Sequence, residues 1–284
     1  MVRVSVAITT DIVKEMVEIQ DPYPLATLGL GRLITGTYLL AAQLKEGFYI
    51  SVRFQGDGPL GELYAECHPN GKGRAYCQNP EADLPLKNGQ LDLAGAIGPG
   101  KIVVSRGQPY QKQPHTSIVP ITTGEIASDL THYLRQSNQT LSVIALSTSL
   151  SPEERVTHAG GVLVELMPET PEAVIQTIEK KVEEAVPLST LLSQGISPEE
   201  IAKKYSHSSR LISKEEPLNL NFFCPCTLER VHRTLLMLGR ASLSEMILKG
   251  EPVNVTCEFC GRKYTVDVES LRDLGLELPD KTET

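Results

Sequence analysis

Two closely spaced pairs of cysteines constrain the fold of this chain more strongly than any other feature of its sequence. The first pair is Cys224-Pro225-Cys226, and the second, Cys257-Glu258-Phe259-Cys260, follows after thirty intervening residues. Zn²⁺ favours four soft ligands at tetrahedral corners, about 2.3 Å from each sulfur, and a fold that joins two such pairs supplies this geometry. The sequence therefore predicts that Cys224, Cys226, Cys257 and Cys260 bind one Zn²⁺ per chain.

The residues around the pairs predict a scaffold for this site. Apolar spacing indicates a helix over Leu228–Leu238, and the capping-box pattern of Ser242 and Glu245 predicts a second short helix that ends at Gly250. Alternating apolar residues flank the second pair and predict a β-hairpin with Cys257 and Cys260 at its turn: Val253, Val255, Tyr264, Val266 and Val268. We expect residues 218–284 to form a small zinc-binding domain that needs the metal for stability.

A shell of four cysteines limits the chemistry of the site. A catalytic zinc keeps three protein ligands and an open position for water, whereas four thiolates close the shell, so we do not expect an enzyme. Two interpretations stay open: a structural zinc ribbon, or a switch in which each pair forms its own disulfide when oxidised. Cys257 and Cys260 lie in a predicted turn, and Cys224 and Cys226 flank a proline, so both pairs are sterically able to bridge.

The region from Met1 to about Thr170 mixes the periodicities of strands and helices. Strand-like alternation occurs in several short segments separated by hairpin-sized gaps, and few helices interrupt them. We therefore expect an α+β core domain with mixed, largely antiparallel sheets over residues 1–170. The predicted strands are Val2–Ile8, Phe48–Phe54, Leu63–Cys67, Lys101–Val104, Leu141–Leu146 and Gly161–Leu166, and the predicted helices contain Leu33–Leu44 and Ile126–Leu134.

Residues 171–217 are predicted to form a helical linker. Thr170 has the character of an N-cap, and Pro171 occupies the first position of an amphipathic helix that continues to Val186. Ser197-Pro198 predicts the start of a further helix. Because the linker is rich in charge and only moderately apolar, we expect its helices to be of low intrinsic stability.

Composition excludes several classes of function. The chain has 27 Lys and Arg against 35 Asp and Glu, a formal net charge of -8, and this acidic balance argues against binding to nucleic-acid phosphates or to an anionic membrane. No segment approaches the roughly 18 consecutive apolar residues of a membrane span, and the N-terminus alternates like a strand instead of resembling a signal peptide. We expect a cytoplasmic protein, in which clustered cysteines serve metal binding or redox chemistry.

Two other sequence signals are rejected because of their surroundings. Gly56–Gly61 matches the G-x-G-x-x-G pattern of dinucleotide sites, but the residues that follow alternate like a strand and do not open a helix. The chain has no G-x-x-x-x-G-K-S/T loop, so we expect no ATP-driven cycle. His232 lies between the cysteine pairs, but four thiolates already complete a zinc shell, and we expect His232 on a helix surface.

Further motifs extend along essentially the whole chain. Glu229-Arg230 follows the first cysteine pair, and Gly261 and Tyr264 follow the second. The upstream motifs are Gly56–Leu60, Pro109–Gln111, Tyr133–Gln139, Ala159–Gly161 and Pro168. In this order the motifs resemble the bacterial redox-regulated heat-shock holdase chaperones, the HslO family or thirty-three-kilodalton chaperonin. Thr227, where the family commonly has Ser, and Asn138, where it commonly has Glu, are small departures that touch no predicted ligand.

The resemblance implies a redox-regulated chaperone that works without ATP. Its reduced, zinc-bound form is inactive; oxidation to Cys224–Cys226 and Cys257–Cys260 disulfides releases the zinc, unfolds the linker and lets the protein hold unfolding client proteins under oxidative stress. The resemblance also implies a homodimer in the oxidised state. Cys67 and Cys77 are not part of the family's motif, and we interpret them as ordinary, partly buried thiols.

Two alternatives to the holdase predict different residues. A constitutive zinc ribbon that docks nucleic acid predicts a basic module, but residues 218–284 contain 8 Lys and Arg against 10 Asp and Glu. A thiol-disulfide oxidoreductase places Cys-x-x-Cys at the start of a helix after a strand, whereas here the motif lies in a predicted hairpin. The sequence favours the holdase, with a structural zinc ribbon that docks a protein partner as the alternative.

Overall fold

A computed structural model describes residues 2–109, 111, 113–206 and 217–277. Its internal contacts divide the chain into two compact units, Met1–Phe223 and Cys224–Thr284. The strands are β1 (Val2–Ile8), β2 (Tyr49–Gly56), β3 (Glu62–Cys67), β4 (Lys72–Cys77), β5 (Gly100–Gly107), β6 (His115–Ile121), β7 (Leu141–Leu150), β8 (Val156–Leu166), β9 (Asn221–Phe222), β10 (Val253–Thr256) and β11 (Lys263–Val266). The helices are α1 (Thr10–Gln20), α2 (Pro24–Ala41), α3 (Leu93–Ile97), α4 (Ile126–Asn138), α5 (Glu172–Glu183), α6 (Leu188–Ser193), α7 (Pro198–Tyr205), α8 (Leu228–Met237), α9 (Gly239–Lys249) and α10 (Val268–Glu277).

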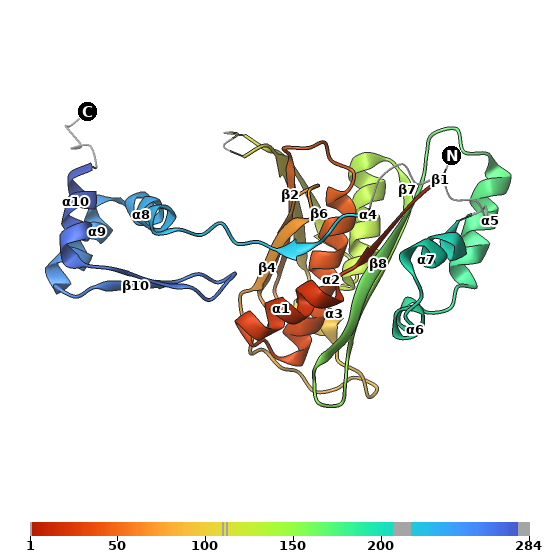
Figure 1. The fold of residues 1–284 in the computed structure, drawn as a ribbon, viewed down its shortest axis with the longest axis horizontal. Coiled ribbons are helices and arrows are strands. Elements are labelled where there is room, and N and C mark those ends of the chain that lie inside the picture. The colour runs from red at the N-terminus through yellow and green to blue at the C-terminus, as the bar shows by residue number, and fades with distance from the viewer. Residues whose placement is uncertain (1, 110, 112, 207–216, 278–284) are drawn as a thin grey trace. The chain divides into compact units, whose positions relative to one another are not determined.

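The first unit is built from two sheets with helix α2 between them (Figure 1). One sheet has six strands in the order β6-β5-β2-β3-β4-β9, and the other has three in the order β1-β8-β7. Among the described strands, every pairing is antiparallel except that of β4 with β9. The predicted α+β fold with a largely antiparallel core, a helical linker and a small C-terminal unit is confirmed.

Helix α2 is buried on all sides because its sequence is apolar all round. Glycines allow its backbone to approach its neighbours closely. A Cβ atom on Gly31 would lie 2.5 Å from the hydroxyl oxygen of Thr148 on β7, and one on Gly36 would lie 2.5 Å from a methyl carbon of Leu130 on α4. Larger residues at these two positions would push the helix away from the three-stranded sheet and from α4.

The three-stranded sheet is apolar on both faces. Alternation along its strands sends Ala7 and Leu163 into the main core with α2, whereas Val4, Val162 and Val164 belong to a second apolar cluster on the opposite face. The linker helices α5, α6 and α7 supply the other side of this second cluster (Figure 1). The linker residues buried there are Ile178, Leu188, Leu191, Ile201 and Tyr205.

The linker helices depend on this packing. Helix α6 has six residues and α7 has eight, well below the length of roughly 12 to 15 residues at which an isolated helix becomes even marginally stable. Both contact the three-stranded sheet within the first unit. The division into a core, a linker and a zinc domain at residues 170 and 217 stays a prediction.

Several predicted elements agree with the structure in detail. Strand β1 covers the predicted residues Val2–Ile8, and the predicted apolar positions of α4 are all buried. Ser197 is the N-cap of α7, and its hydroxyl accepts a hydrogen bond from the Glu200 amide. Gly250 ends α9 in the left-handed conformation, as predicted.

Three predicted details are wrong. Pro171, not Thr170, is the N-cap of α5, because the Thr170 hydroxyl donates to the Met167 carbonyl instead. Helix α9 begins at Gly239, so Ser242 lies inside the helix and does not cap it. Val268 begins α10 instead of extending β11.

The sequence patterns did not predict α1, β4, β6 or α10, each of which is a substantial element. Helix α1 buries Ile12, Val13 and Met16, a helical spacing that was overlooked. The inward positions of β4 are Gly73, Ala75 and Cys77, whose small side chains give a weak alternation signal. Strand β6 contains a proline, which disfavours a strand except at the edge of a sheet, where β6 lies. Within the described ranges, no helix is both long and apolar enough to cross a membrane.

Candidate metal centre

The first cysteine pair lies immediately before α8. Thr227 is the N-cap of this helix, and its hydroxyl oxygen accepts a hydrogen bond from the Arg230 amide at 3.3 Å. Thr227 therefore fixes where the helix begins, directly after Cys226. Cys224 and Cys226 lie in the extended segment that enters the helix, and both side chains are half-buried.

The second pair lies in the turn that joins β10 to β11. The Cys257 amide donates to the Arg262 carbonyl at 2.9 Å, and the Gly261 amide donates to the Cys257 carbonyl at 2.8 Å. Gly261 has a φ of 64°, a left-handed conformation that closes the turn at low cost for glycine. The predicted hairpin with Cys257 and Cys260 at its turn is confirmed.

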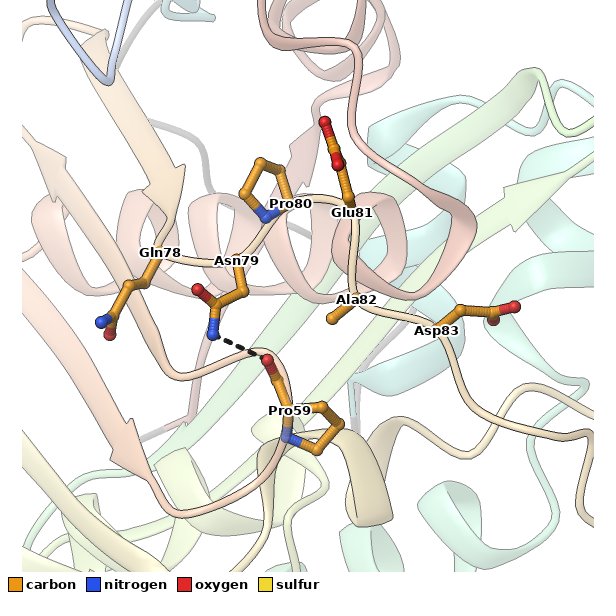
Figure 2. Close-up of a pocket in the computed structure, with 7 residues that line it drawn as sticks. All are labelled: Pro59, Gln78, Asn79, Pro80, Glu81, Ala82 and Asp83. Atoms are coloured by element: carbon orange, nitrogen blue, oxygen red, sulfur yellow. Dashed lines mark hydrogen bonds between the residues drawn. The ribbon is translucent and has the colours of Figure 1, made fainter.

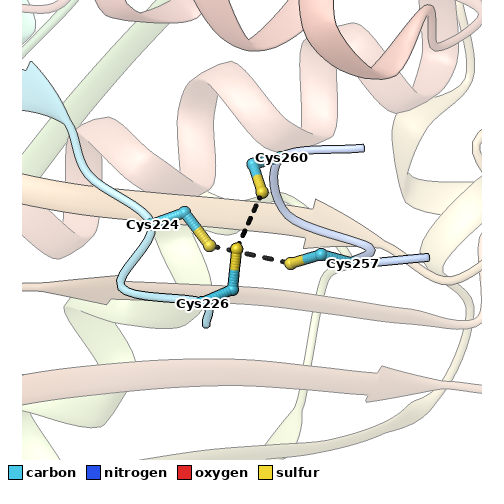
Figure 3. Close-up of side chains that lie close together, drawn as sticks. All are labelled: Cys224, Cys226, Cys257 and Cys260. Carbon is cyan, nitrogen blue, oxygen red and sulfur yellow. Dashed lines mark hydrogen bonds between the residues drawn. The ribbon is translucent and has the colours of Figure 1, made fainter. Parts of the chain in front are cut away.

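The four sulfur atoms converge on one point (Figure 3). The Sγ atoms of Cys224 and Cys257 are 3.6 Å apart, those of Cys226 and Cys260 are 3.2 Å apart, and all four lie within 4.8 Å of one another. A tetrahedral ion with bonds of about 2.3 Å needs sulfur atoms about 3.8 Å apart. The arrangement therefore fits a four-coordinate metal ion and could hold one.

His232 is not part of this group. It lies on α8, half-buried, and its Nε2 atom is buried without a hydrogen-bond partner. The metal-ligating atoms that cluster in this unit come from the four cysteines.

The thiols of the cluster do not ionise equally. Burial opposes ionisation of Cys226, but hydrogen bonds from the Tyr264 hydroxyl and from the neighbouring thiols outweigh it and lower the pKa of Cys226 to about 7. Burial, together with the hydrogen bonds that Cys260 makes to Cys226 and the other thiols, raises the pKa of Cys260 to about 12. A second thiolate is unfavourable beside the first, so four thiolates together require a cation.

The remaining two cysteines are in the main core of the first unit. Cys67 is 0% exposed and Cys77 is 7% exposed, so the interpretation of both as only partly buried is wrong. Burial raises the pKa of Cys67 and raises that of Cys77 to about 11. Buried neutral thiols of this kind react slowly with oxidants, because the thiolate is the reactive species.

The glycine-rich segment Gly56–Gly61 forms a turn that leads into β3, as the strand-like alternation predicted. A surface hollow beside this turn is lined by Pro59 and by the segment Gln78–Asp83 (Figure 2). The Asn79 side-chain amide donates to the Pro59 carbonyl at 2.9 Å. The charged groups that line the hollow are the carboxylates of Glu81 and Asp83, which would repel a nucleotide pyrophosphate.

The fold and the site together define a class of protein: an α+β body with a helical linker, joined to a small unit folded around four cysteines. Comparison with known proteins identifies the family. A family model described as "Hsp33 protein" matches residues 1–267. The chain belongs to the Hsp33 family, and the resemblance inferred from the sequence motifs is confirmed.

Named relatives cover nearly the whole chain. The "33 kDa chaperonin" of Thermodesulfovibrio yellowstonii is 36% identical over 277 residues, which cover 98% of this chain and 96% of the relative. The "33 kDa chaperonin" of Bacillus subtilis strain 168 is 32% identical over 274 residues, covering 96% and 94%. The crystal structure of the 33 kDa chaperonin (HSP33) of Thermotoga maritima superposes with a TM-score of 0.87 at 29% identity, covering 97% of this chain and 93% of that one.

The hydrogen bond between Tyr264 and Cys226 generates a prediction about pH. A thiolate ligand is present above its pKa and is lost to protons below it, so a higher pKa of Cys226 lets protons compete with the metal at a higher pH. Replacing Tyr264→Phe removes the donor 3.1 Å from the Cys226 sulfur and keeps the ring. We expect acid-induced release of Zn²⁺, followed with a chromogenic chelator, to move upward by up to about one pH unit.

The matched control for this prediction is Tyr64→Phe. Tyr64 lies on β3 in the first unit, where its hydroxyl donates a hydrogen bond to Glu66. This control should leave the pH of zinc release unchanged. An unchanged release curve in Tyr264→Phe would show that the hydroxyl does not stabilise the thiolate.

Proposed function

We propose that this protein is an ATP-independent holdase chaperone that binds unfolding client proteins under oxidative stress, and that its four-cysteine cluster is the zinc switch that controls it. The observation that carries the proposal is the convergence of the four sulfur atoms within 4.8 Å. Membership of the Hsp33 family and the name "33 kDa chaperonin" of its relatives support a chaperone, and the expectation that the chain is not an enzyme agrees with those names.

In the reduced state, Cys224, Cys226, Cys257 and Cys260 bind one Zn²⁺ as thiolates. The apolar cluster of the C-terminal unit is small, with Val231, Leu235, Leu243, Val266, Leu271 and Leu274 as its buried members. Structural zinc contributes on the order of 10 kcal/mol to the folding of such small domains. The metal therefore decides whether this unit is folded.

Oxidation removes the ligands. A thiolate attacks a peroxide, an S–O bond forms as the O–O bond breaks, and the products are a sulfenic acid and water after protonation. A second thiolate then attacks the sulfenic sulfur, an S–S bond forms, and a further water leaves. Two equivalents of peroxide convert the four cysteines into two disulfides and release the Zn²⁺.

The disulfides formed are Cys224–Cys226 and Cys257–Cys260. The shortest sulfur distances in the folded cluster are across the pairs, between Cys224 and Cys257 and between Cys226 and Cys260. Once the metal leaves and the unit unfolds, however, closing a loop of three or four residues costs about 2 kcal/mol less than closing one of about 34. Neighbours in the sequence therefore react with each other first.

Loss of the zinc unit releases the linker. Helices α5 to α7 supply the outer side of the second apolar cluster, and α6 and α7 are too short to persist without that packing. When they detach, the apolar side chains of Val4, Val162 and Val164 and of the linker itself become available to unfolding proteins. Client binding then needs no nucleotide.

The proposed redox chemistry also bears on the compartment, the oligomeric state and the partners of the protein. We place it in the cytoplasm, where glutathione and thioredoxin keep the cysteines reduced until an oxidant arrives. The active, oxidised form is a homodimer, which sedimentation of the reduced and oxidised protein would test. The partners are unfolding polypeptides, with no role for nucleic acid or membrane.

The first prediction of this proposal concerns zinc stoichiometry. Reduced protein should contain one Zn²⁺ per chain, and Cys257→Ser should reduce the zinc content well below one because an incomplete shell binds the metal weakly. Cys67→Ser is the control, since Cys67 lies in the main core and should leave the zinc content at one. Full zinc occupancy in Cys257→Ser would refute the assigned ligands.

The second prediction concerns the disulfides. Peptide mapping of protein oxidised with hydrogen peroxide should find Cys224 bonded to Cys226 and Cys257 bonded to Cys260, with Cys67 and Cys77 still reduced. A Cys224–Cys257 or Cys226–Cys260 bridge would mean that oxidation proceeds within the folded cluster. A bridge to Cys67 or Cys77 would overturn the assignment of the redox cysteines.

The third prediction joins the switch to the function. Hydrogen exchange of the oxidised protein should show lost protection in α5–α7 and in the C-terminal unit, with β2 still protected, and suppression of client aggregation should rise in parallel. The reduced protein is the control for both measurements. If anti-aggregation activity appears while protection in α5–α7 is unchanged, uncovering by the linker is not needed for chaperone function. Equal activity in both redox states would favour a constitutive zinc ribbon.

A further inference from the structure

The segment that directly precedes Cys224 covers one edge of the six-stranded sheet. Strand β9 pairs in parallel with β4, with Asn221 opposite Lys72 and Phe222 opposite Gly73. The Asn221 amide donates to the Gly71 carbonyl and the Phe223 amide donates to the Gly73 carbonyl, both at 2.9 Å. A strand of two residues therefore occupies an edge that β4 presents over its six residues.

The backbone of β4 shows which groups this edge offers. The Lys72 carbonyl accepts from the His68 amide, so residues 72, 74 and 76 of β4 direct their backbone groups toward β3. Gly73 and Ala75 direct theirs to the opposite side. There β9 covers Gly73, and the Gln20 side-chain amide donates to the Ala75 carbonyl at 2.8 Å. The edge is thus covered by one short strand and one side chain, a common protection against pairing with other chains.

The covering segment also fills apolar space. Leu220 and Phe222, two residues apart, pack against the main core. The Phe223 ring lies under the Lys72 ammonium group, 4.3 Å from Nζ to the ring centroid. The edge of β4 therefore accommodates an extended chain that has apolar side chains at alternate positions and then an aromatic side chain.

Close approach of the covering segment depends on a glycine. A Cβ atom on Gly71 would lie 2.3 Å from the Asn219 carbonyl oxygen, and Gly71 has a φ of +84°, which a residue with a side chain rarely adopts. The Tyr38 hydroxyl, from α2, donates to the Asn221 carbonyl at 3.0 Å. Both contacts are to backbone carbonyl groups. The space between Gly71 and Tyr38 therefore fits a main chain irrespective of its side chains.

The cover is held weakly compared with the other strands. Its hydrogen bonds to Gly71, Gly73 and Tyr38 are few, and each contributes little net stability because water replaces it when it opens. Residue 224, the first cysteine of the cluster, follows Phe223 directly in the chain. Only Phe223 separates β9 from Cys224, so a change in the backbone at Cys224 is two peptide bonds from the strand.

We propose that β9 is a removable cover, and that once it detaches, the edge of β4 binds an extended segment of an unfolded polypeptide through main-chain hydrogen bonds at Gly73 and at the adjoining Gly71. The partner is a chain with apolar residues at alternate positions. Leu220 and Phe222 have this pattern where the segment packs against the main core. This inference rests on the proposed holdase function and adds a second client surface to the face beneath the linker.

Residue-resolved hydrogen exchange tests the proposal on the unaltered chain. The probe is α-lactalbumin with its cysteines reduced and alkylated, so that it stays unfolded. Oxidation should cost the Gly73 amide its protection, and addition of the probe should restore it, whereas the Arg74 amide, which faces β3, should stay protected throughout. Protection of Gly73 that never falls on oxidation, or never returns with the probe, would overturn the proposal.

Substitutions in β9 give an independent test. Asn221→Pro removes the amide that bonds to Gly71 and should make the reduced, zinc-loaded protein bind the probe about tenfold more tightly than the reduced wild type does. Leu218→Pro is the matched control, since Leu218 is exposed and precedes the strand; its probe affinity should equal that of the wild type. Zinc content is measured in both variants, and Asn221→Pro with full zinc and unchanged affinity would refute the role of β9.

Tyr38→Phe keeps the test decisive if the proline variant does not fold. It removes the hydroxyl that donates to the Asn221 carbonyl, keeps the ring, and should raise exchange at the Gly73 amide about fivefold, the effect of one hydrogen bond. Unchanged exchange would count against a weakly held cover. The holdase proposal fails separately, if the oxidised wild type does not suppress aggregation. Suppression of aggregation without renewed protection at the Gly73 amide would refute the edge site alone.

Discussion

Repulsion between like charges in a small space is the constraint on which the C-terminal unit depends. Four thiol sulfurs lie within 4.8 Å of one another, so each thiolate formed there opposes the formation of the next. A divalent cation removes this repulsion and converts it into attraction. In the proposed mechanism, the close spacing of each pair along the chain then lets oxidation replace the metal with S–S bonds.

The first unit depends on a different constraint, the burial of a sheet with two apolar faces. One face of the β1-β8-β7 sheet packs against α2, whose glycines bring it close, and the other packs against the linker helices. A sheet that is apolar on both faces needs a cover on each. Because α6 and α7 are short, the outer cover is the less stable of the two, which agrees with the proposal that this face becomes uncovered.

The segment from the linker to Cys224 connects these two constraints. It leaves a short strand, β9, on the edge of β4 and then enters the cysteine cluster at the next residue after Phe223. In the proposed mechanism, the metal stabilises both covers: the linker helices over a sheet face and β9 over a sheet edge. A chaperone that exposes a face and an edge together offers unfolded chains both apolar contact and main-chain hydrogen bonds.

The sequence by itself determined much of this protein. The spacing of the cysteines predicted the four-cysteine group, and alternation with period two located β1 and the hairpin around Cys257 and Cys260. These predictions succeed because close spacing along the chain and side-chain periodicity are local properties. Local patterns were less informative at β4, whose inward residues are small, and at the start of α5, where the Thr170 hydroxyl bonds backward to Met167.

Only the tertiary structure decided which distant residues meet. The pairing of Cys226 with the Tyr264 hydroxyl, the burial of Cys67 in the main core and the placement of β9 on the edge of β4 join residues that are 38 or more positions apart, or depend on every element that surrounds them. Sequence periodicity indicates that a face is apolar, but not which partner covers it. That choice is made by the packing of the whole chain, because burial and hydrogen bonding are satisfied only when all elements are in place.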